Sequence, residues 1–298
     1  MRKTTLFKRL VLDRHILVMP GAYDALSAKI IEQTGFKALA VGGYAVSASY
    51  LGKPDIGLLT LTEMVDHIAR IADAVNIPVF ADGDTGHGNA TNVIRTVKEI
   101  ERTGAAAMFL EDQLFPKRCG HMEGKSVIPA QEMIAKIKAA VDARTDQDFV
   151  IMARTDSLAL HGVDEAIDRA NCYREAGADM IFVEAPTTIS EMRRITGRVK
   201  APTMANNVEG GKTPVLSAGE LEAIGYSVVA FPTSAVYASS LALTGVMKAI
   251  FEDGTSEAFQ AQMMRFEEFN RFIGLASIRS EEQKYYDGSA CARSCGEK

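Results

Sequence analysis

Eight short apolar runs recur along the chain, and a segment with helix signals follows each of them. Their near-continuous apolar character, rather than strict alternation, is typical of parallel strands that are covered on both faces. The runs occupy residues 16–20, 38–41, 78–81, 106–110, 149–153, 180–183, 202–205 and 227–231. Eight strand–helix units in about 230 residues favour an α/β fold of the (β/α)8 TIM-barrel type over an open, doubly wound sheet.

Local signals mark where the intervening helices begin and end. A Ser or Thr followed three residues later by Glu is the spacing of a capping box, and a glycine just before the next apolar run marks a helix end. The predicted starts are Thr60, Thr188 and Ser217, and the predicted stops are Gly35, Gly104, Gly177 and Gly225.

Composition excludes several classes of protein. The 298 residues are 47% hydrophobic and 24% charged, with a net charge of −5, which is ordinary for a globular enzyme and gives no basic footprint for nucleic acid. The first residues lack the apolar core of a signal peptide, and no uninterrupted apolar run reaches the roughly 18 residues of a membrane span. We therefore expect a cytoplasmic protein with neither nucleic acid nor membrane as a partner.

The C-terminal region carries an apolar helical pattern beyond the expected barrel. Phe259, Met263, Met264, Phe266, Phe269 and Phe272 fall within residues 256–285. A helical segment this apolar needs a partner surface. We therefore predict a catalytic barrel over residues 1–255 and an oligomerisation segment with a flexible tail over residues 256–298.

Polar residues follow six consecutive predicted strands. In barrel enzymes the carboxyl ends of the strands surround the active site, so these side chains are expected to converge. The sets are Gly42-Gly43-Tyr44, Asp82-Gly-Asp84, Glu111, Arg154, Glu184 and Asn206-Asn-Val-Glu209.

Three carboxylates in this set point to a metal ion. Asp82 and Asp84 are two apart in a segment expected to be extended, which would place both on one face, and Glu111 follows the neighbouring strand. Such a cluster repels itself unless a cation or proton is present. All-oxygen ligation favours Mg²⁺ or Mn²⁺.

A cysteine loop follows the fourth strand, with Lys117, Arg118 and His121 flanking Cys119. Cations beside a thiol lower its pKa, so the sequence predicts an activated cysteine for proton transfer or nucleophilic attack. The other cysteines carry weaker signals: Cys172 is expected to be buried in a helix. Residues 291 and 295 lack the partner pair of a zinc site.

Together, the motifs Asp82-Gly-Asp84-Thr-Gly-His-Gly, Glu111-Asp-Gln, Lys117-Arg-Cys-Gly-His and Met152-Ala-Arg-Thr-Asp resemble the isocitrate lyase/phosphoenolpyruvate mutase superfamily over residues 15–285. The segment around Glu209, followed by Gly-Gly-Lys-Thr-Pro, is similar to the 2,3-dimethylmalate lyase and petal-death-protein branch, near the 2-methylisocitrate lyases. The resemblance implies a Mg²⁺-dependent barrel and a homotetramer, a dimer of dimers that exchange their C-terminal helices.

The resemblance also implies roles. Asp82 and Asp84 would hold the metal, with Asp55 and Glu111 acting through water. Gly42, Gly43, Tyr44, Asn206 and Glu209 would bind the substrate. Cys119 would protonate the leaving carbanion, with Lys117, His121, Arg154 and Glu184 completing the reactive set.

The expected reaction is Mg²⁺-dependent carbon–carbon cleavage of a 2-hydroxy di- or tricarboxylic acid, of the 2,3-dimethylmalate or 2-methylisocitrate type, to a 2-oxo acid such as pyruvate and a carboxylic acid. Three alternatives remain open. The first is an oxaloacetate hydrolase or decarboxylase of the same superfamily. Ser234 leaves this alternative open, since the hydrolytic branch tends to carry a serine near the position of Pro232. A phosphonate mutase or hydrolase is another; the carbon–phosphorus mutases resemble this chain elsewhere but typically carry Asn in place of Cys119. A non-enzymatic barrel that binds small acids would not need the carboxylates to converge.

Overall fold

Eight parallel strands form the centre of the protein, as the apolar runs predicted. The computed structural model describes residues 1–287. Each strand overlaps its predicted run and shifts by no more than two residues at either end. The strands are β1 Leu17–Pro20, β2 Leu39–Val41, β3 Val79–Asp82, β4 Ala107–Glu111, β5 Val150–Thr155, β6 Met180–Val183, β7 Met204–Asn206 and β8 Val228–Phe231.

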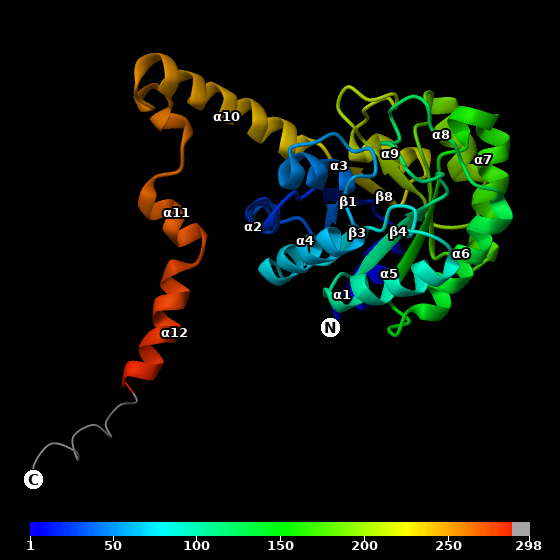
Figure 1. Cartoon of the computed structure of the whole chain (residues 1–298), viewed down its shortest axis with the longest axis horizontal. Helices are drawn as coiled ribbons and strands as arrows, with labels where there is room; N and C mark the ends of the chain where they lie inside the picture. The colour runs from blue at the N-terminus through cyan, green and yellow to red at the C-terminus, as the bar shows by residue number, and fades with distance from the viewer. Residues whose placement is uncertain (288–298) are drawn as a thin grey trace, which may run out of the picture. The chain divides into compact units, whose positions relative to one another are not determined.

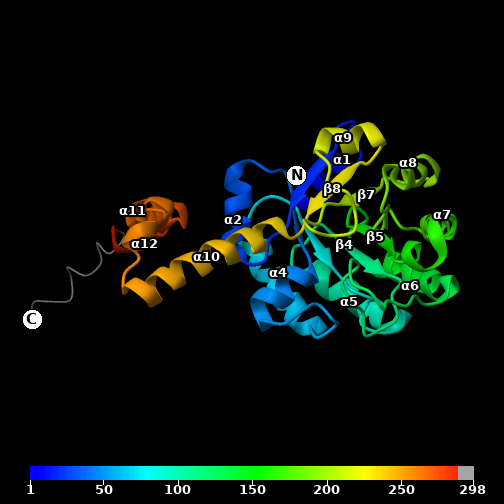
Figure 2. The same cartoon turned by 90° about the horizontal axis from the view of Figure 1, so that it is seen from above.

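The strands close into a barrel. Ladders run in the orders β1–β8–β7 and β2–β3–β4–β5–β6, and all of their pairings are parallel. Single parallel bridges join the two ladders, Gly21 with Ala40 on one side and Ile181 with Thr203 on the other. The (β/α)8 barrel is therefore confirmed, and the strands lie inside a ring of helices (Figures 1 and 2).

The ring helices begin and end where the local signals predicted. Thr60, Thr188 and Ser217 each form a complete capping box with the glutamate three residues later. Gly35, Gly104, Gly177 and Gly225 all have positive φ, which glycine adopts without strain. The helices of this part are α1 Lys3–Val11, α2 Ala25–Thr34, α3 Gly43–Val46, α4 Leu61–Ala74, α5 Ala90–Arg102, α6 Ala130–Ala143, α7 Leu158–Glu175, α8 Ile189–Arg198 and α9 Ala218–Ile224, with a π-helical turn η1 at Ser47–Leu51.

Aromatic rings fill the barrel interior as a continuous column. Phe7, from α1, stacks on Phe80 with ring centroids 5.9 Å apart, and Phe80 lies 5.8 Å from Phe109. Phe109 in turn meets the edge of Phe182 at 6.4 Å. These four side chains are buried, so the interior is a packed core that leads from α1 up to the carboxyl ends of the strands.

The chain divides into two compact units, Met1–Ser239 and the residues from Ser240 onward. The second unit contains most of α10 Ser234–Asp253, then η2 Glu257–Gln262, α11 Phe266–Phe272 and α12 Leu275–Asp287. It exposes large apolar side chains, among them Leu241, Phe251 and Phe266. The domain boundary at residue 255 and the exchange of helices between subunits both stay predictions.

Helix α10 has the length and mean hydropathy that a membrane crossing needs, although it contains no uninterrupted apolar run of that length. Only 11% of its apolar window is buried. Length and composition alone are weak grounds for a membrane span, because an apolar helix that packs in an assembly meets the same criteria.

Candidate active site

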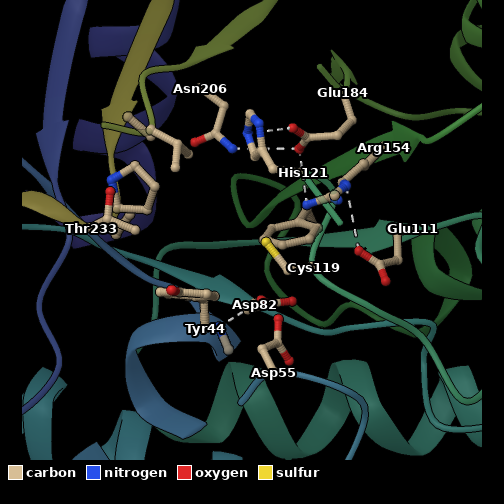
Figure 3. Close-up of a pocket in the computed structure, with 18 of the residues that line it drawn as sticks. Tyr44, Asp55, Asp82, Glu111, Cys119, His121, Arg154, Glu184, Asn206 and Thr233 are labelled. Atoms are coloured by element: carbon tan, nitrogen blue, oxygen red, sulfur yellow. Dashed lines mark hydrogen bonds and ion pairs between the residues drawn. The ribbon is translucent and has the colours of Figure 1, made fainter. Parts of the chain in front are cut away.

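A cavity of about 170 Å³ opens at the carboxyl ends of the strands. Figure 3 shows its polar side chains converging from several strands and loops. Of the predicted site residues, the cavity is lined by Gly42, Gly43, Tyr44, Asp55, Asp82, Glu111, Lys117, Cys119, His121, Arg154, Glu184 and Asn206. The structure thus brings most of the predicted set together.

The acidic cluster consists of Asp55, Asp82, Asp84 and Glu111, all of them buried. The ammonium nitrogen of Lys117 lies among them, 2.6 Å from Oδ1 of Asp84 and 2.8 Å from Oδ1 of Asp55. Lys117 therefore supplies one positive charge to four acidic side chains.

Asp84 reaches the cluster differently from the prediction. Strand β3 ends at Asp82, and Asp84 lies in a tight turn with φ of 48° rather than in extended backbone. Its amide donates to Oδ1 of Asp82 at 2.8 Å, which closes the turn. The expected same-face geometry of a strand was wrong, because the turn rather than the strand brings the two carboxylates together.

The acidic cluster carries more negative charge than its protein cation balances. Burial and the nearby Asp84 carboxylate raise the pKa of Asp82 to about 6. Burial likewise raises the pKa of Asp55, and raises that of Glu111 well above its usual value. Within residues 1–287, Oε1 of Glu111 is buried without a hydrogen-bond partner. A cluster of carboxyl groups with raised pKa values and an unpartnered buried oxygen is typical of a site that binds a divalent cation.

The cluster suits an ion with few direct protein ligands. Within the described residues, no three acidic, histidine or cysteine side chains are placed to hold one ion directly. Mg²⁺ commonly keeps several waters and binds through one or two carboxylates. Asp82 and Asp84 fit direct ligation, and Asp55 and Glu111 fit contacts through water.

The backbone after β2 also faces the cavity. Gly42 is extended, Gly43 begins α3, and both line the cavity. The Gly43 amide donates to Oδ2 of Asp82 at 2.7 Å, and its binding of a substrate carboxylate stays a prediction. Tyr44 shares a hydrogen bond of 2.9 Å with the hydroxyl of Tyr237.

Arg154 is the central cation of the opposite wall. Its Nε and NH2 donate to the two carboxylate oxygens of Asp156 at 2.9 and 3.1 Å, and NH1 lies 3.2 Å from Oε2 of Glu184. The guanidinium carbon lies 5.0 Å from the centroid of the Phe182 ring, within cation–π distance. These contacts fix the plane of the guanidinium, and Nε remains 3.4 Å from Glu111.

Cys119 faces the cavity between Tyr44 and Arg154 (Figure 3). The prediction of a lowered thiol pKa was wrong: burial raises the pKa of Cys119 to about 11. The neighbouring cations are turned elsewhere, with Lys117 in the acidic cluster and Arg118 donating to the carbonyl of Glu123. The thiol is therefore held protonated, which suits a proton donor and does not suit a resting nucleophile.

His121 is oriented by contacts on both ring nitrogens. Its Nδ1 accepts from the amide of Lys212 at 3.0 Å, so Nε2 carries the proton, and Nε2 lies 3.0 Å from Oε1 of Glu184. Glu184 is wholly buried and has a lowered pKa: Arg154 and His121 outweigh the effect of its burial. Glu184 thus orients both Arg154 and His121, and Asn206 donates to it at 3.4 Å.

Glu209 has a different environment from the one predicted. Its carboxylate accepts from Thr233 at 2.6 Å and from the hydroxyl of Ser234, which gives it no contact with Arg154, His121 or Tyr44 among the described residues. Of the residues after β8, Pro232 and Thr233 line the cavity within residues 1–287, whereas Ser234 does not. Glu209 therefore supports the cavity wall through Thr233 and does not face the cavity itself.

Several residues of the candidate active site were not predicted from the sequence. Lys125 forms a buried ion pair of 2.9 Å with Asp156, and Tyr237 reaches the site from the first turn of α10. Asp156 ends the motif Met152-Ala-Arg-Thr-Asp, two residues after Arg154 and just beyond β5, and this spacing is a signal for pairing. Lys125 and Tyr237 carried no comparable signal.

Comparison with known proteins places this geometry in a family. The family model described as phosphoenolpyruvate phosphomutase matches residues 7–251. The chain is 48% identical to 2,3-dimethylmalate lyase of Eubacterium barkeri, over 94% of this chain and 97% of that one. It is 43% identical to 2-methylisocitrate lyase of Aeropyrum pernix, over 92% and 88% of the two chains.

Solved structures agree with the sequence relatives. A crystal structure of 2,3-dimethylmalate lyase superposes with a TM-score of 0.89 at 34% identity, covering 100% of this chain and 99% of that one. Oxaloacetate acetylhydrolase with 3,3-difluorooxalacetate has a TM-score of 0.90 at 30% identity, over 95% and 97%. Phosphonopyruvate hydrolase with oxalate and Mg²⁺ has a TM-score of 0.87 at 30% identity, over 96% and 100%. The barrel, the converging site and these matches together show that the chain belongs to the phosphoenolpyruvate mutase/isocitrate lyase superfamily.

Proposed function

We propose that the protein is a Mg²⁺-dependent carbon–carbon lyase that cleaves a 2-hydroxy dicarboxylic acid of the 2,3-dimethylmalate type. The observation that carries the proposal is the Cys119 thiol, which is half-buried, protonated and turned into a cavity between the acidic cluster and Arg154. A carbon–carbon lyase must protonate the carbon that leaves, and a thiol held in its neutral form at this place is suited to that task.

The acidic cluster fits a divalent ion, and the similar structure of phosphonopyruvate hydrolase is a complex with oxalate and Mg²⁺. Asp82 and Asp84 would hold Mg²⁺ directly, and Asp55 and Glu111 would do so through water. When bound, the ion would supply Lewis-acid stabilisation to a negatively charged substrate oxygen. Manganese has similar ligand preferences and is expected to substitute.

The opposite wall suits the departing fragment. Arg154 is buried and held by Asp156 and Glu184, so its charge is oriented before the substrate arrives. His121 lies in the same region, with Nε2 3.0 Å from Oε1 of Glu184. Loss of the C2 hydroxyl proton with cleavage of the C2–C3 bond would give the 2-oxo acid and an enediolate. These two groups would stabilise the negative charge of the enediolate while Cys119 delivers its proton to the leaving carbon.

The apolar part of the lining bears on substrate class. Phe182, Met204, Val208 and Pro232 face the cavity, and these side chains can accept alkyl groups but offer no partner to an additional carboxylate. The lining therefore supports a methyl-substituted dicarboxylic acid in preference to a tricarboxylic acid such as 2-methylisocitrate.

Oxaloacetate hydrolysis is the second candidate, because a solved oxaloacetate acetylhydrolase resembles the fold closely. Ser234 is the residue that kept this candidate open. Its hydroxyl is engaged by Glu209 and it lies outside the cavity lining described for residues 1–287, whereas Pro232 lies within it. This arrangement favours the lyase.

A substrate panel tests the proposal. With Mg²⁺ present, we expect pyruvate-type 2-oxo acid release from 2,3-dimethylmalate at a kcat/KM at least tenfold above that for 2-methylisocitrate. Oxaloacetate and phosphonopyruvate serve as the probes for the other reactions. Faster turnover of either one than of any 2-hydroxy acid would replace the lyase assignment.

We also propose that the protein is a homotetramer, since the second unit exposes many apolar side chains.

A further inference from the structure

Two buried lysines stand at the ends of the segment that carries Cys119, residues 116–125, which we call the cysteine loop. Lys117 places its ammonium in the acidic cluster. At the other end, the Lys125 side chain is only 3% exposed, and its ammonium lies 2.9 Å from Oδ1 of Asp156. The Lys125 ammonium also donates to the carbonyl of Gly120, one residue after Cys119.

Asp156 connects this contact to the barrel. It follows β5, is fully buried, and binds Arg154 through both carboxylate oxygens. Its amide donates to Asp112 at 2.9 Å, which anchors the backbone at the end of the strand. Lys125 therefore links a rigid barrel residue to the backbone of the cysteine loop.

The backbone at Gly120 lies unusually close to the same barrel residues. A Cβ atom at this position would stand 2.3 Å from NH2 of Arg154 and 2.4 Å from Cγ of Glu184. The cysteine loop thus packs closely against the Arg154 guanidinium at Gly120, the residue whose carbonyl accepts a hydrogen bond from Lys125. If the loop moved away, the Lys125 ammonium would lose one of its two partners, and a buried ammonium without partners is costly.

Lys125 itself lies outside the cavity lining described for residues 1–287, so its effect reaches the reaction through other residues. We propose that Lys125 is a positioning residue: it bridges Asp156 and the Gly120 carbonyl and thereby holds the Cys119 thiol in place beside Arg154. The proposal rests on the proposed function in one respect, namely that Cys119 is the proton donor.

The test uses the full-length protein and measures the reactivity of Cys119 itself. Iodoacetamide labelling followed by mass spectrometry of the peptide that contains residue 119 reports how often the loop opens. Cys172 is exposed in α7 and serves as the internal reference for reagent strength. The matched control is Glu123→Gln, which weakens the exposed ion pair of Glu123 with Lys212 at the tip of the same loop.

We expect Lys125→Met to label at residue 119 at least tenfold faster than wild type, with Cys172 labelling and the Glu123→Gln control unchanged. In the lyase assay kcat should fall at least tenfold, while the Kd for pyruvate, measured with Mg²⁺ present, stays within threefold, since Lys125 does not touch the bound acid. If Lys125→Met does not fold, Lys125→Gln replaces it: its uncharged amide can satisfy one buried acceptor but lacks the charge and reach to bridge Asp156 and the Gly120 carbonyl together, so the same faster labelling is expected.

The outcomes separate the two proposals. Labelling of Cys119 at the wild-type rate in the folded Lys125 variant overturns the positioning role, whatever the enzyme's substrate. Accelerated labelling in a protein without lyase activity supports the positioning role and removes the proposed function. A pyruvate Kd that weakens in step with kcat assigns Lys125 to general structural support and also overturns the role.

Discussion

The ammonium of Lys117 lies 2.6 Å from Oδ1 of Asp84, so a cation from the cysteine loop stands within the acidic cluster. The four carboxyl groups raise the pKa of Lys117 well above its usual value, against the effect of burial. One ammonium leaves the cluster with excess negative charge. The position of the cysteine loop and the charge of the cluster are therefore coupled through the contacts of Lys117 with Asp84 and Asp55.

The first prediction concerns the divalent ion. Excess chelator should abolish turnover, and added Mg²⁺ or Mn²⁺ should restore it, because the raised carboxyl pKa values in the cluster call for a second source of positive charge. Asp82→Asn should weaken Mn²⁺ binding, measured by electron paramagnetic resonance, at least tenfold. Asp164→Asn, at an exposed ion pair, is the control. Full activity in excess chelator would contradict the metal dependence.

The second prediction concerns the proton donor. Cys119→Ser should lower kcat by about 10²- to 10⁴-fold, the range for loss of a general acid, because a serine hydroxyl is far less acidic than a thiol. Binding of pyruvate should change little, which separates chemistry from affinity. Cys172→Ser, at the exposed cysteine of α7, should keep wild-type kinetics. Near-normal turnover by Cys119→Ser would favour a mutase or decarboxylase.

The third prediction uses the close approach at Gly120. Gly120→Ala should reduce kcat at least tenfold, since the added Cβ would collide with Arg154 and Glu184 and push the cysteine loop outward. The same substitution at Gly197 in α8, where a Cβ meets no atom within 4 Å, is the control. Gly197→Ala should leave kcat unchanged and stabilise the helix by about 0.5–1 kcal/mol. Equal kinetics for the two variants would show that the cysteine loop can accommodate a Cβ atom at residue 120 without displacing Cys119.

The fourth prediction is a pH dependence. Although burial opposes it, Arg154 and Lys125 lower the pKa of Asp156 from 3.8 to about 2. A depressed acid pKa gives stability that is fully present above the unfolded pKa and is lost as the pH falls toward 2. Asp156→Asn should thus lower the free energy of unfolding by about 2 kcal/mol near neutral pH. Urea titrations measure the free energy of unfolding of both proteins, and the difference between them should become smaller below pH 4. A difference that does not change with pH would contradict an ionised Asp156.

The fifth prediction concerns assembly. Removing residues beyond 255 should abolish the tetramer, because α11 and its neighbours carry exposed Met263, Met264, Phe266 and Phe269 that require a partner surface. Sedimentation velocity at several concentrations measures the change. Phe266→Ser in the full chain is a milder variant with the same expected direction. A truncated protein that stays a tetramer would place the interface elsewhere.

The barrel could be predicted because its signals are local. Each strand is a short apolar run, and each capping box or glycine stop lies within one turn of the helix that it limits. The placement of Asp82, Glu111 and Arg154 followed in turn from the barrel, since the carboxyl ends of its strands must face one another.

The errors arose where long-range packing decides the outcome. Sequence neighbours suggested a lowered thiol pKa at Cys119, but burial raises that pKa, and Lys117 pairs with Asp55 and Asp84, which belong to other loops. Cys172 was expected to be buried and is exposed on α7. Glu209 was expected in the cavity, but the hydroxyls after β8 bind it. Residues 291 and 295 lie outside the described part of the chain.

The aromatic column has a consequence for attempts to change the substrate. Trimming Phe182 would be the obvious way to admit a bulkier acid, yet that ring is also the surface on which the Arg154 guanidinium rests. Because Phe182 meets Phe109, which stacks on Phe80 and through it on Phe7 of α1, the loss would propagate to the far end of the barrel. A designer should therefore redesign the column as a unit, or enlarge the site from the side of Tyr44 and Pro232 instead.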